Sequence, residues 1–153
     1  MEQTKTLYIA YGSNLNTEQM AHRCPTATIV GPVMLNGYEL SFKGHQGGAY
    51  ATVGKKKGGT VPVLLWELEA TDEQALDRYE GYPYFYRKEW VTVTVGGKPI
   101  EAMVYIMNER YQHCTPSKSY YETVESGYKE AGFDCGVLEK ALQASFKVYR
   151  REG

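Results

Sequence analysis

The sequence has few cysteines, no excess of charge of one sign and no long apolar run. Its three cysteines are far apart and odd in number, so they indicate neither a metal-binding knuckle nor a closed set of disulfides. With 17 basic and 18 acidic residues, the net charge of -1 does not indicate a nucleic acid or an anionic membrane as partner. No segment is apolar for long enough to span a bilayer, and the N-terminus lacks the pattern of a signal peptide. These absences predict a soluble, cytoplasmic protein with reduced thiols.

The length is that of one domain. A chain of 153 residues can bury roughly two-thirds of its unfolded surface, which is enough for a core without metal or disulfide bridges. No internal repeat or linker divides it, so we expect residues 1–153 to form a single domain. The sequence leaves open whether that domain is a monomer or a homodimer.

Hydrophobic patterning predicts several strands. Residues 7–11 form a short apolar run that is typical of a buried strand, and residues 61–68 form another. Two alternating runs around Gly96-Gly97 predict an antiparallel hairpin that ends at Met107. Glycine, proline and asparagine interrupt residues 27–42, where we expect short strands joined by turns. The glycine-rich residues 43–60 predict a flexible excursion around one brief strand, residues 50–53, with a solvated lysine tip.

Helix signals occur at four places. Asn16 can cap a short helix that ends before Pro25, and a capping box at Thr71 precedes a helix that ends at Glu80. Further caps at Ser119 and Asp134 precede two amphipathic helices. Strands with a short inserted helix, followed by two terminal helices, indicate an α+β domain built on a largely antiparallel sheet or small barrel.

The stretch "LYIAYGSNLN" joins a strand to a helix through Gly12, Ser13 and Asn14. Such a corner leaves several backbone N–H groups unpaired near the positive end of a helix, where they can bind an anion. The corner lacks the second glycine and the lysine of a P-loop, so a carboxylate fits better than a phosphate. The more frequent role of such a corner is an ordinary turn.

Glu80 is a carboxylate that stands among aromatic residues in the stretch "LDRYEGYPYFYR", which also holds Tyr79, Tyr82, Tyr84, Phe85 and Tyr86. The helix dipole opposes ionisation of Glu80 by only about 0.3–1 kcal/mol, which is less than one pKa unit. Burial among those rings would have to raise its pKa further, towards the neutral range that general acid–base catalysis needs. A glutamate at a helix end is more often a solvated surface residue.

Other catalytic chemistries lack support in the sequence. Ser13 has no base near it in the chain, and no nucleophile-elbow motif is present. The three histidines, His22, His45 and His113, do not have metal-ligand spacing. The sequence therefore predicts neither a metal site nor a cofactor.

Four strings, in order, resemble the γ-glutamylcyclotransferase-like family, including its bacterial members. They are "YGSNLN", "MAHRCPTA", "LDRYEGYPYFYRKEWVTV" and "PSKSYYETVESGYKEAGF", and the resemblance extends from about Leu7 to the last helix. The resemblance implies a small, mostly antiparallel β-barrel flanked by helices. It also implies an enzyme that releases 5-oxoproline and a free amine or amino acid from a small-molecule γ-glutamyl substrate, without metal or cofactor.

The same resemblance implies roles for eight residues. The substrate-binding loop of the family corresponds to Tyr11, Gly12, Ser13, Asn14 and Leu15. Glu80 corresponds to the catalytic acid–base, and Tyr86 and Tyr120 correspond to pocket tyrosines. One carboxylate can move both protons in turn, because the substrate's own α-amine is the nucleophile. The loop amides would bind either the substrate carboxylate or the developing oxyanion.

Two further questions stay open at this point. A non-catalytic module that binds a carboxylate or a peptide could share the fold, because one scaffold often carries unrelated functions. The identity of the leaving amine or amino acid is also open. It would contact the pocket mouth, which we expect residues 43–57 to form.

Overall fold

The computed structural model describes residues 5–45 and 48–152, and side chains as far as Phe146 in the last helix. Its elements follow one another as β1 (Thr6–Ala10), the 3-10 helix η1 (Ser13–Leu15), α1 (Thr17–Arg23), β2 (Thr28–His45), β3 (Gly48–Leu68), α2 (Ala70–Glu80), β4 (Tyr86–Val95), β5 (Lys98–Met107), β6 (Gln112–His113), α3 (Lys118–Ala131) and α4 (Cys135–Glu152).

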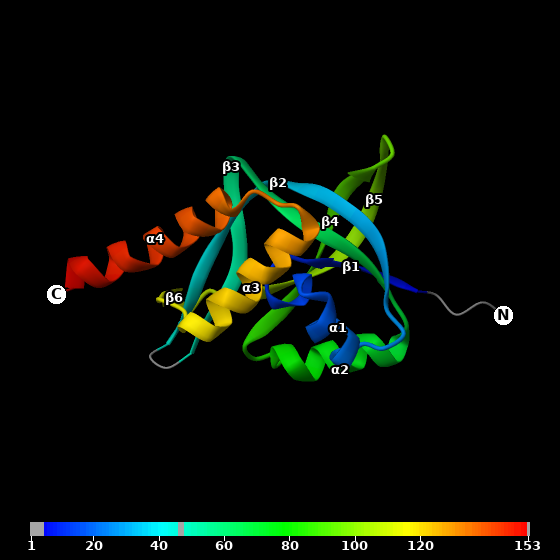
Figure 1. Cartoon of the computed structure of the whole chain (residues 1–153), viewed down its shortest axis with the longest axis horizontal. Coiled ribbons are helices and arrows are strands. Elements are labelled where there is room, and N and C mark those ends of the chain that lie inside the picture. The colour runs from blue at the N-terminus through cyan, green and yellow to red at the C-terminus, as the bar shows by residue number, and fades with distance from the viewer. Residues whose placement is uncertain (1–4, 46–47, 153) are drawn as a thin grey trace.

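The six strands form one curled sheet in the order β4-β5-β1-β3-β2-β6. The pairing of β1 with β5 is parallel, and every other pairing among the described strands is antiparallel. The sheet curls far enough to bring β2 near β4, which gives the half-barrel seen in Figure 1. This confirms the predicted α+β class with a mostly antiparallel barrel and flanking helices.

Strands β2 and β3 form one long hairpin, and the expectation of short strands followed by a flexible excursion is wrong. The pairing register shifts at Gly31 and again at Gly37, so these glycines form bulges inside a continuous strand rather than turns between strands. Both have positive φ, 151° and 84°, which glycine adopts without a Cβ clash. Opposite Gly37, residues 56–59 loop out of β3.

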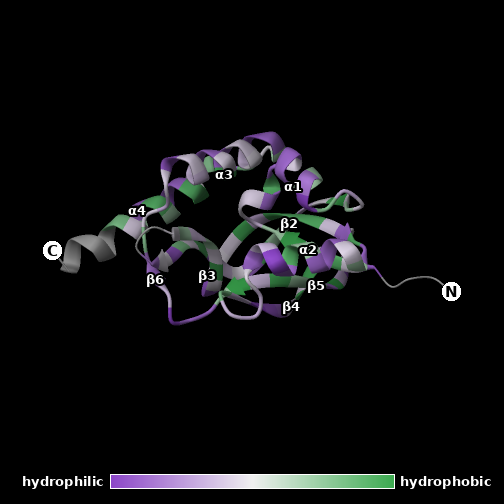
Figure 2. Cartoon of the chain, turned by 90° about the horizontal axis from the view of Figure 1, so that it is seen from below, coloured by the Kyte–Doolittle hydropathy of each residue, from purple (hydrophilic) through white to green (hydrophobic). Residues whose placement is uncertain are grey.

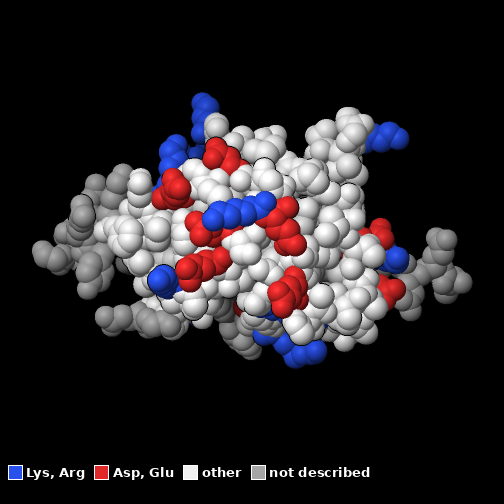
Figure 3. Space-filling view, viewed as in Figure 1, with Lys and Arg blue, Asp and Glu red and all other residues white. Residues whose placement is uncertain are grey.

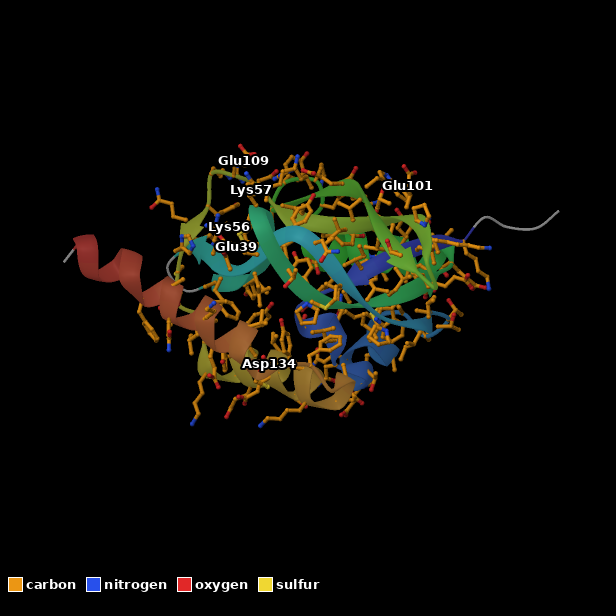
Figure 4. The ribbon with its side chains drawn as sticks, turned by 90° about the horizontal axis from the view of Figure 1, so that it is seen from above. Glu39, Lys56, Lys57, Glu101, Glu109 and Asp134 are labelled. Carbon is orange, nitrogen blue, oxygen red and sulfur yellow. The ribbon has the colours of Figure 1, made fainter. Side chains whose placement is uncertain are left out.

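The predicted lysine tip therefore lies on a bulge in the side of the hairpin. Lys56 and Lys57 are exposed there, and they line one shallow depression together with Glu39 of β2. Figure 4 shows these three residues on the hairpin, away from Asp134 at the junction of α3 and α4.

The helix boundaries follow capping contacts, two of which differ from the predicted ones. Asn16 caps α1 as predicted, since its side chain accepts a hydrogen bond from the Gln19 N–H. The capping box of α2 is formed by Glu69 and Asp72 rather than by Thr71. The helix therefore begins two residues earlier than predicted, and the two carboxylates satisfy the free N–H groups of residues 69 and 72.

The remaining caps lie at the end of α2 and at the starts of α3 and α4. As predicted, α2 ends at Glu80. Its C-cap is Gly81, whose φ of 65° is the left-handed conformation that glycine favours. The cap of α3 is Ser117, two residues before the predicted Ser119. Asp134 precedes α4, where its Oδ1 atom accepts a hydrogen bond of 2.9 Å from the Gly136 N–H.

Strand β1 lies inside the sheet between β3 and β5, and its last three residues are buried. In Figure 2 the hydrophobic segments gather along the strands in the middle of the molecule, with α3 across one side of them.

Figure 3 shows basic and acidic side chains interspersed on the visible face of the molecule, so this face carries no large area of charge of one sign. No helix in the described residues combines the length and apolar character needed to cross a bilayer.

Helix α3 packs directly on η1 through Gly127. A β-carbon at Gly127 would lie 2.6 Å from the Leu15 Cβ atom and 2.9 Å from the Asn16 backbone nitrogen. These are distances that real β-carbons do not show, so only glycine lets the two segments approach this closely. Leu15 is buried at this contact.

We expect Gly127→Ala to destabilise the protein. Alanine favours a helix interior by about 1 kcal/mol over glycine, but overpacking against fixed backbone costs roughly 1–3 kcal/mol. Denaturant unfolding should therefore show a net loss of up to about 2 kcal/mol in the free energy of unfolding, near the upper end because the clash involves backbone atoms. Gly54→Ala is the matched control, because nothing lies within 4 Å of its added carbon. A Gly127→Ala variant as stable as the control would contradict this packing argument.

Candidate active site

A pocket of about 380 Å³ opens where β1, η1, β3, α2 and α3 meet. Its lining is dominated by phenol rings and holds one carboxylate. The residues that form it are Tyr8, Tyr11, Gly12, Ser13, Asn14, Tyr50, Ala51, Arg78, Tyr79, Glu80, Gly81, Phe85, Tyr86, Tyr105 and Tyr120.

The corner after β1 forms one wall of this pocket. Gly12 precedes η1, and its carbonyl accepts a hydrogen bond from the Leu15 N–H. The backbone N–H groups of Ser13 and Asn14 donate to no residue in the described part of the chain. Because both residues line the pocket, we expect their unpaired N–H groups to be within reach of a ligand. The structure thus places the predicted loop at a cavity.

Helix α2 carries Glu80 to the opposite wall. Lys88 of β4 holds this helix on the sheet through ion pairs of 2.7 Å to Glu73 and 2.9 Å to Asp77. The Tyr105 hydroxyl donates to the same Asp77 carboxylate at 2.6 Å. Since Glu80 lies in the next turn after Asp77, this docking fixes where its side chain meets the pocket.

The Glu80 carboxyl is half-buried and has no hydrogen-bond donor among the residues that the structure describes. Burial raises its pKa from the ordinary 4.5 to about 8, although the positive charge of Arg23 acts in the opposite direction. The carboxyl is therefore protonated in a large fraction of molecules at neutral pH. A group that can hold or release a proton there is suited to acid–base chemistry.

Two tyrosines from distant parts of the chain meet at the backbone of Ala51. The Tyr86 hydroxyl donates to the Ala51 carbonyl at 2.7 Å, whereas the Tyr120 hydroxyl accepts from the Ala51 N–H at 3.1 Å. The two hydroxyls therefore differ in what they can offer a ligand. Tyr120 keeps its proton free to donate, and Tyr86 keeps lone pairs free to accept.

Four buried phenols of the pocket stay neutral. Burial is the main cause that raises the pKa of Tyr8, Tyr11, Tyr86 and Tyr120, and the negative charge of Glu80 raises each of them further. All four rings therefore remain protonated at neutral pH. The pocket presents hydrogen-bonding hydroxyls around a single acid, with no second carboxylate in its described lining.

Arg23 of α1 does not line the pocket, but its side chain contacts both the corner and α2. Its guanidinium donates to the Asn14 side chain at 2.5 Å and to Gln19 at 2.6 Å, and lies 3.6 Å from the centre of the Tyr79 ring. The Tyr79 hydroxyl in turn lies 3.0 Å from the Ser13 hydroxyl. These contacts hold the corner and the last turn of α2 in one arrangement.

The structure brings together most of the predicted site residues. Seven of the eight line the pocket, namely Tyr11, Gly12, Ser13, Asn14, Glu80, Tyr86 and Tyr120. Leu15 does not line it, because its side chain is buried against Gly127. Of the aromatics around Glu80, Tyr82 and Tyr84 also lie outside the lining.

Several pocket residues escaped the sequence reasoning. Tyr50 and Ala51 lie in the brief strand that we predicted within the glycine-rich stretch, and they were not named as site residues, although residues 43–57 were expected to form the mouth. Tyr8 and Tyr105 come from strands that gave no functional signal. Their spacing in the chain carries no information, because only the pairing of β1 with β5 brings them together, with ring centres 5.9 Å apart.

No group of three or more histidine, cysteine, aspartate or glutamate side chains is placed to hold a metal ion within the described residues. The three cysteines are free thiols, and Cys24 is buried.

Comparison with known proteins shows the same fold and related sequences. Residues 8–128 match the family described as "Gamma-glutamyl cyclotransferase, AIG2-like". Gamma-glutamylcyclotransferase from Homo sapiens is 32% identical over 143 residues, which cover 88% of this chain and 76% of the human protein. The Bos taurus protein of the same name is 34% identical with the same coverage.

Among solved structures, one named gamma-glutamyl cyclotransferase superposes with a TM-score of 0.80 at 31% identity, over 90% of this chain and 86% of that one. The family match covers most of the chain and includes the corner, Glu80, Tyr86 and Tyr120. The chain therefore belongs to the γ-glutamyl cyclotransferase, AIG2-like family.

Proposed function

We propose that this protein is a γ-glutamylcyclotransferase in which Glu80 is the single proton-transferring residue. The reaction converts a small γ-glutamyl compound into 5-oxoproline and a free amine or amino acid. The observation that carries this assignment is one carboxyl with a pKa raised to about 8, set in a pocket of neutral phenols opposite two free backbone donors.

The chemistry needs no nucleophile from the protein. The substrate's α-ammonium group first gives a proton to the Glu80 carboxylate. The freed α-amine attacks the γ-carbonyl carbon and closes a five-membered ring. Glu80 gives this proton to the leaving nitrogen as its bond to the γ-carbon breaks. It then takes the second proton, which the ring nitrogen must lose to become the lactam N–H, and passes it to the departing amine, which leaves as an ammonium group. The carboxylate is regenerated, and no water is consumed.

A single acid suffices because each proton that leaves the α-nitrogen goes to the leaving nitrogen, and one group can carry them in turn. A hydrolase of comparable design would need separate groups to activate water and to protonate the leaving group. A pKa near 8 matches this dual role, because the group must accept a proton and return it at similar cost.

The other pocket residues bind and fold the substrate. The backbone N–H groups of Ser13 and Asn14 donate to an anion, either the substrate α-carboxylate or the oxyanion on the attacked carbon. The Tyr120 hydroxyl, which accepts from Ala51, donates its own proton towards the substrate. Holding a flexible chain bent for ring closure lowers the entropic part of the barrier.

Glu80→Gln should abolish most activity while preserving the fold. Glutamine keeps the shape of the side chain but cannot carry the proton, and positioned acid–base groups contribute about a hundred- to ten-thousand-fold to rate. Release of 5-oxoproline from a γ-glutamyl amino acid measures the effect. Glu101→Gln, an exposed acid on β5, is the control and should match the parent protein. A folded Glu80→Gln enzyme that works at the parental rate would refute this role.

Glu80→Gln should also change how stability depends on pH. Because the folded-state pKa of about 8 lies above the ordinary 4.5, the folded protein retains a proton that the unfolded chain releases between these values. The contribution of Glu80 to stability is thus full below pH 4.5 and is lost as pH rises towards 8. Thermal melts at several pH values should show the melting temperature of the variant rising relative to that of the parent protein from pH 5 to pH 8.5. A constant difference would mean that Glu80 ionises normally.

Tyr120→Phe should lower kcat/KM by a smaller factor, about two- to tenfold, because one hydrogen bond contributes about 0.5–1.5 kcal/mol. The variant loses the donor to the substrate and leaves the Ala51 N–H without its partner. Tyr121→Phe is the matched control, since Tyr121 is the next residue of α3 and does not line the pocket. Equal effects of both substitutions would rule out a role for the Tyr120 hydroxyl.

A further inference from the structure

The pocket has an inner end and a mouth, which differ in burial. Tyr8, Tyr11 and Tyr105 at the inner end are 4%, 7% and 2% exposed. Among the lining aromatics, Tyr50 and Tyr79 are 39% and 45% exposed, and they mark the mouth. A ligand that fills the pocket therefore has one end enclosed and one end beside these two rings.

The two mouth rings are not equally available. Tyr79 is already engaged, because the Arg23 guanidinium lies over its ring and its hydroxyl contacts Ser13. Among the residues that the structure describes, no cation lies over the Tyr50 ring. This ring packs edge to face against Tyr120 at 5.1 Å and against Phe85 at 5.9 Å. These contacts hold the ring in place and leave the rest of its surface open.

Phe85 extends the same wall and is itself fixed on two sides. Its ring packs edge to face against Tyr86 at 5.0 Å and against Tyr111 at 4.7 Å. Tyr50 and Phe85 thus stand directly outside Tyr120 and Tyr86, the two tyrosines that hold the Ala51 backbone. The wall is rigid because each ring is braced by others.

Ring closure dictates which part of the substrate faces this wall. The glutamyl part must reach Glu80 and the backbone donors of the corner, and it folds on itself there. The leaving group is the other end of the molecule, and it departs through the mouth. A scattered exposed tyrosine is normal on any surface, but a braced aromatic pair beside the exit of a reaction pocket offers apolar contact to whatever leaves.

We propose that Tyr50 and Phe85 form the subsite for the leaving group and favour γ-glutamyl compounds whose leaving amine carries an aromatic ring. This inference rests on the proposed function, since only the cyclisation defines a leaving group. An aromatic ring of the leaving group that packs against Tyr50 and Phe85 adds an aromatic contact. It also buries apolar surface that stays exposed to water when the leaving group is small.

The test compares γ-glutamylphenylalanine with γ-glutamylalanine, which differ by one ring at the leaving group. We expect the parent protein to have about a tenfold higher kcat/KM for the phenylalanine compound, in the range that one aromatic contact and its buried area give. Tyr50→Ala should remove most of this preference by slowing the phenylalanine compound much more than the alanine compound. Tyr50→Phe should retain it, because the ring remains.

Tyr84→Ala is the matched control, since Tyr84 is 79% exposed and does not line the pocket. It should leave both substrates unchanged. The subsite is refuted if the parent protein turns over the alanine compound equally well, or if Tyr50→Ala slows both substrates by the same factor. Release of 5-oxoproline from neither compound would instead refute the proposed function, and the subsite with it.

Discussion

The burial of one unpaired carboxyl governs the organisation of this protein. Glu80 has an opposing cation only at a distance, and its raised pKa records the free energy that its ionisation would cost in that place. The other acids of α2 are treated differently: Glu73 and Asp77 are paired with Lys88, and Asp72 accepts from the Thr26 hydroxyl. Paired charges thus dock the helix, and the unpaired one is left facing the cavity.

The second constraint is the backbone of β3 at Ala51. Its N–H and carbonyl point to Tyr120 and Tyr86, so a strand edge becomes the part that fixes two functional hydroxyls. Gly12 belongs to the same contact, because a β-carbon there would lie 3.1 Å from the Ala51 side chain. Corner, strand and two tyrosines are therefore positioned by one residue that has no reactive group of its own.

The sequence predicted the elements whose signals are local. The run into Gly12, the cap at Asn16, the end of α2 at Gly81 and the hairpin around Gly96-Gly97 depend on neighbours a few residues apart, and all four are found. The long β2–β3 hairpin depends on pairing between residues up to about forty apart. Its glycines were interpreted as turns because a bulge and a turn require the same backbone freedom.

The same distinction applies to the site. Glu80, Tyr86 and Tyr120 could be named because they lie in motifs that resemble a known family, and the pocket contains all three. Tyr8, Tyr50 and Tyr105 could not, since their positions follow from strand register and from contacts between rings. Leu15 lies in the matching motif but packs under α3, so membership of a motif did not separate a binding residue from a packing residue.

Arg23 shows what the motif "MAHRCPTA" contributes. A free guanidinium beside the pocket would hold Glu80 ionised, and the acid would then be a poor proton donor. Here the cation donates to the Asn14 and Gln19 side chains and lies over the face of Tyr79, and burial outweighs its effect on the Glu80 pKa. The same contacts tie the corner to α2. One residue therefore places the backbone donors and the acid relative to each other while leaving the acid able to keep its proton.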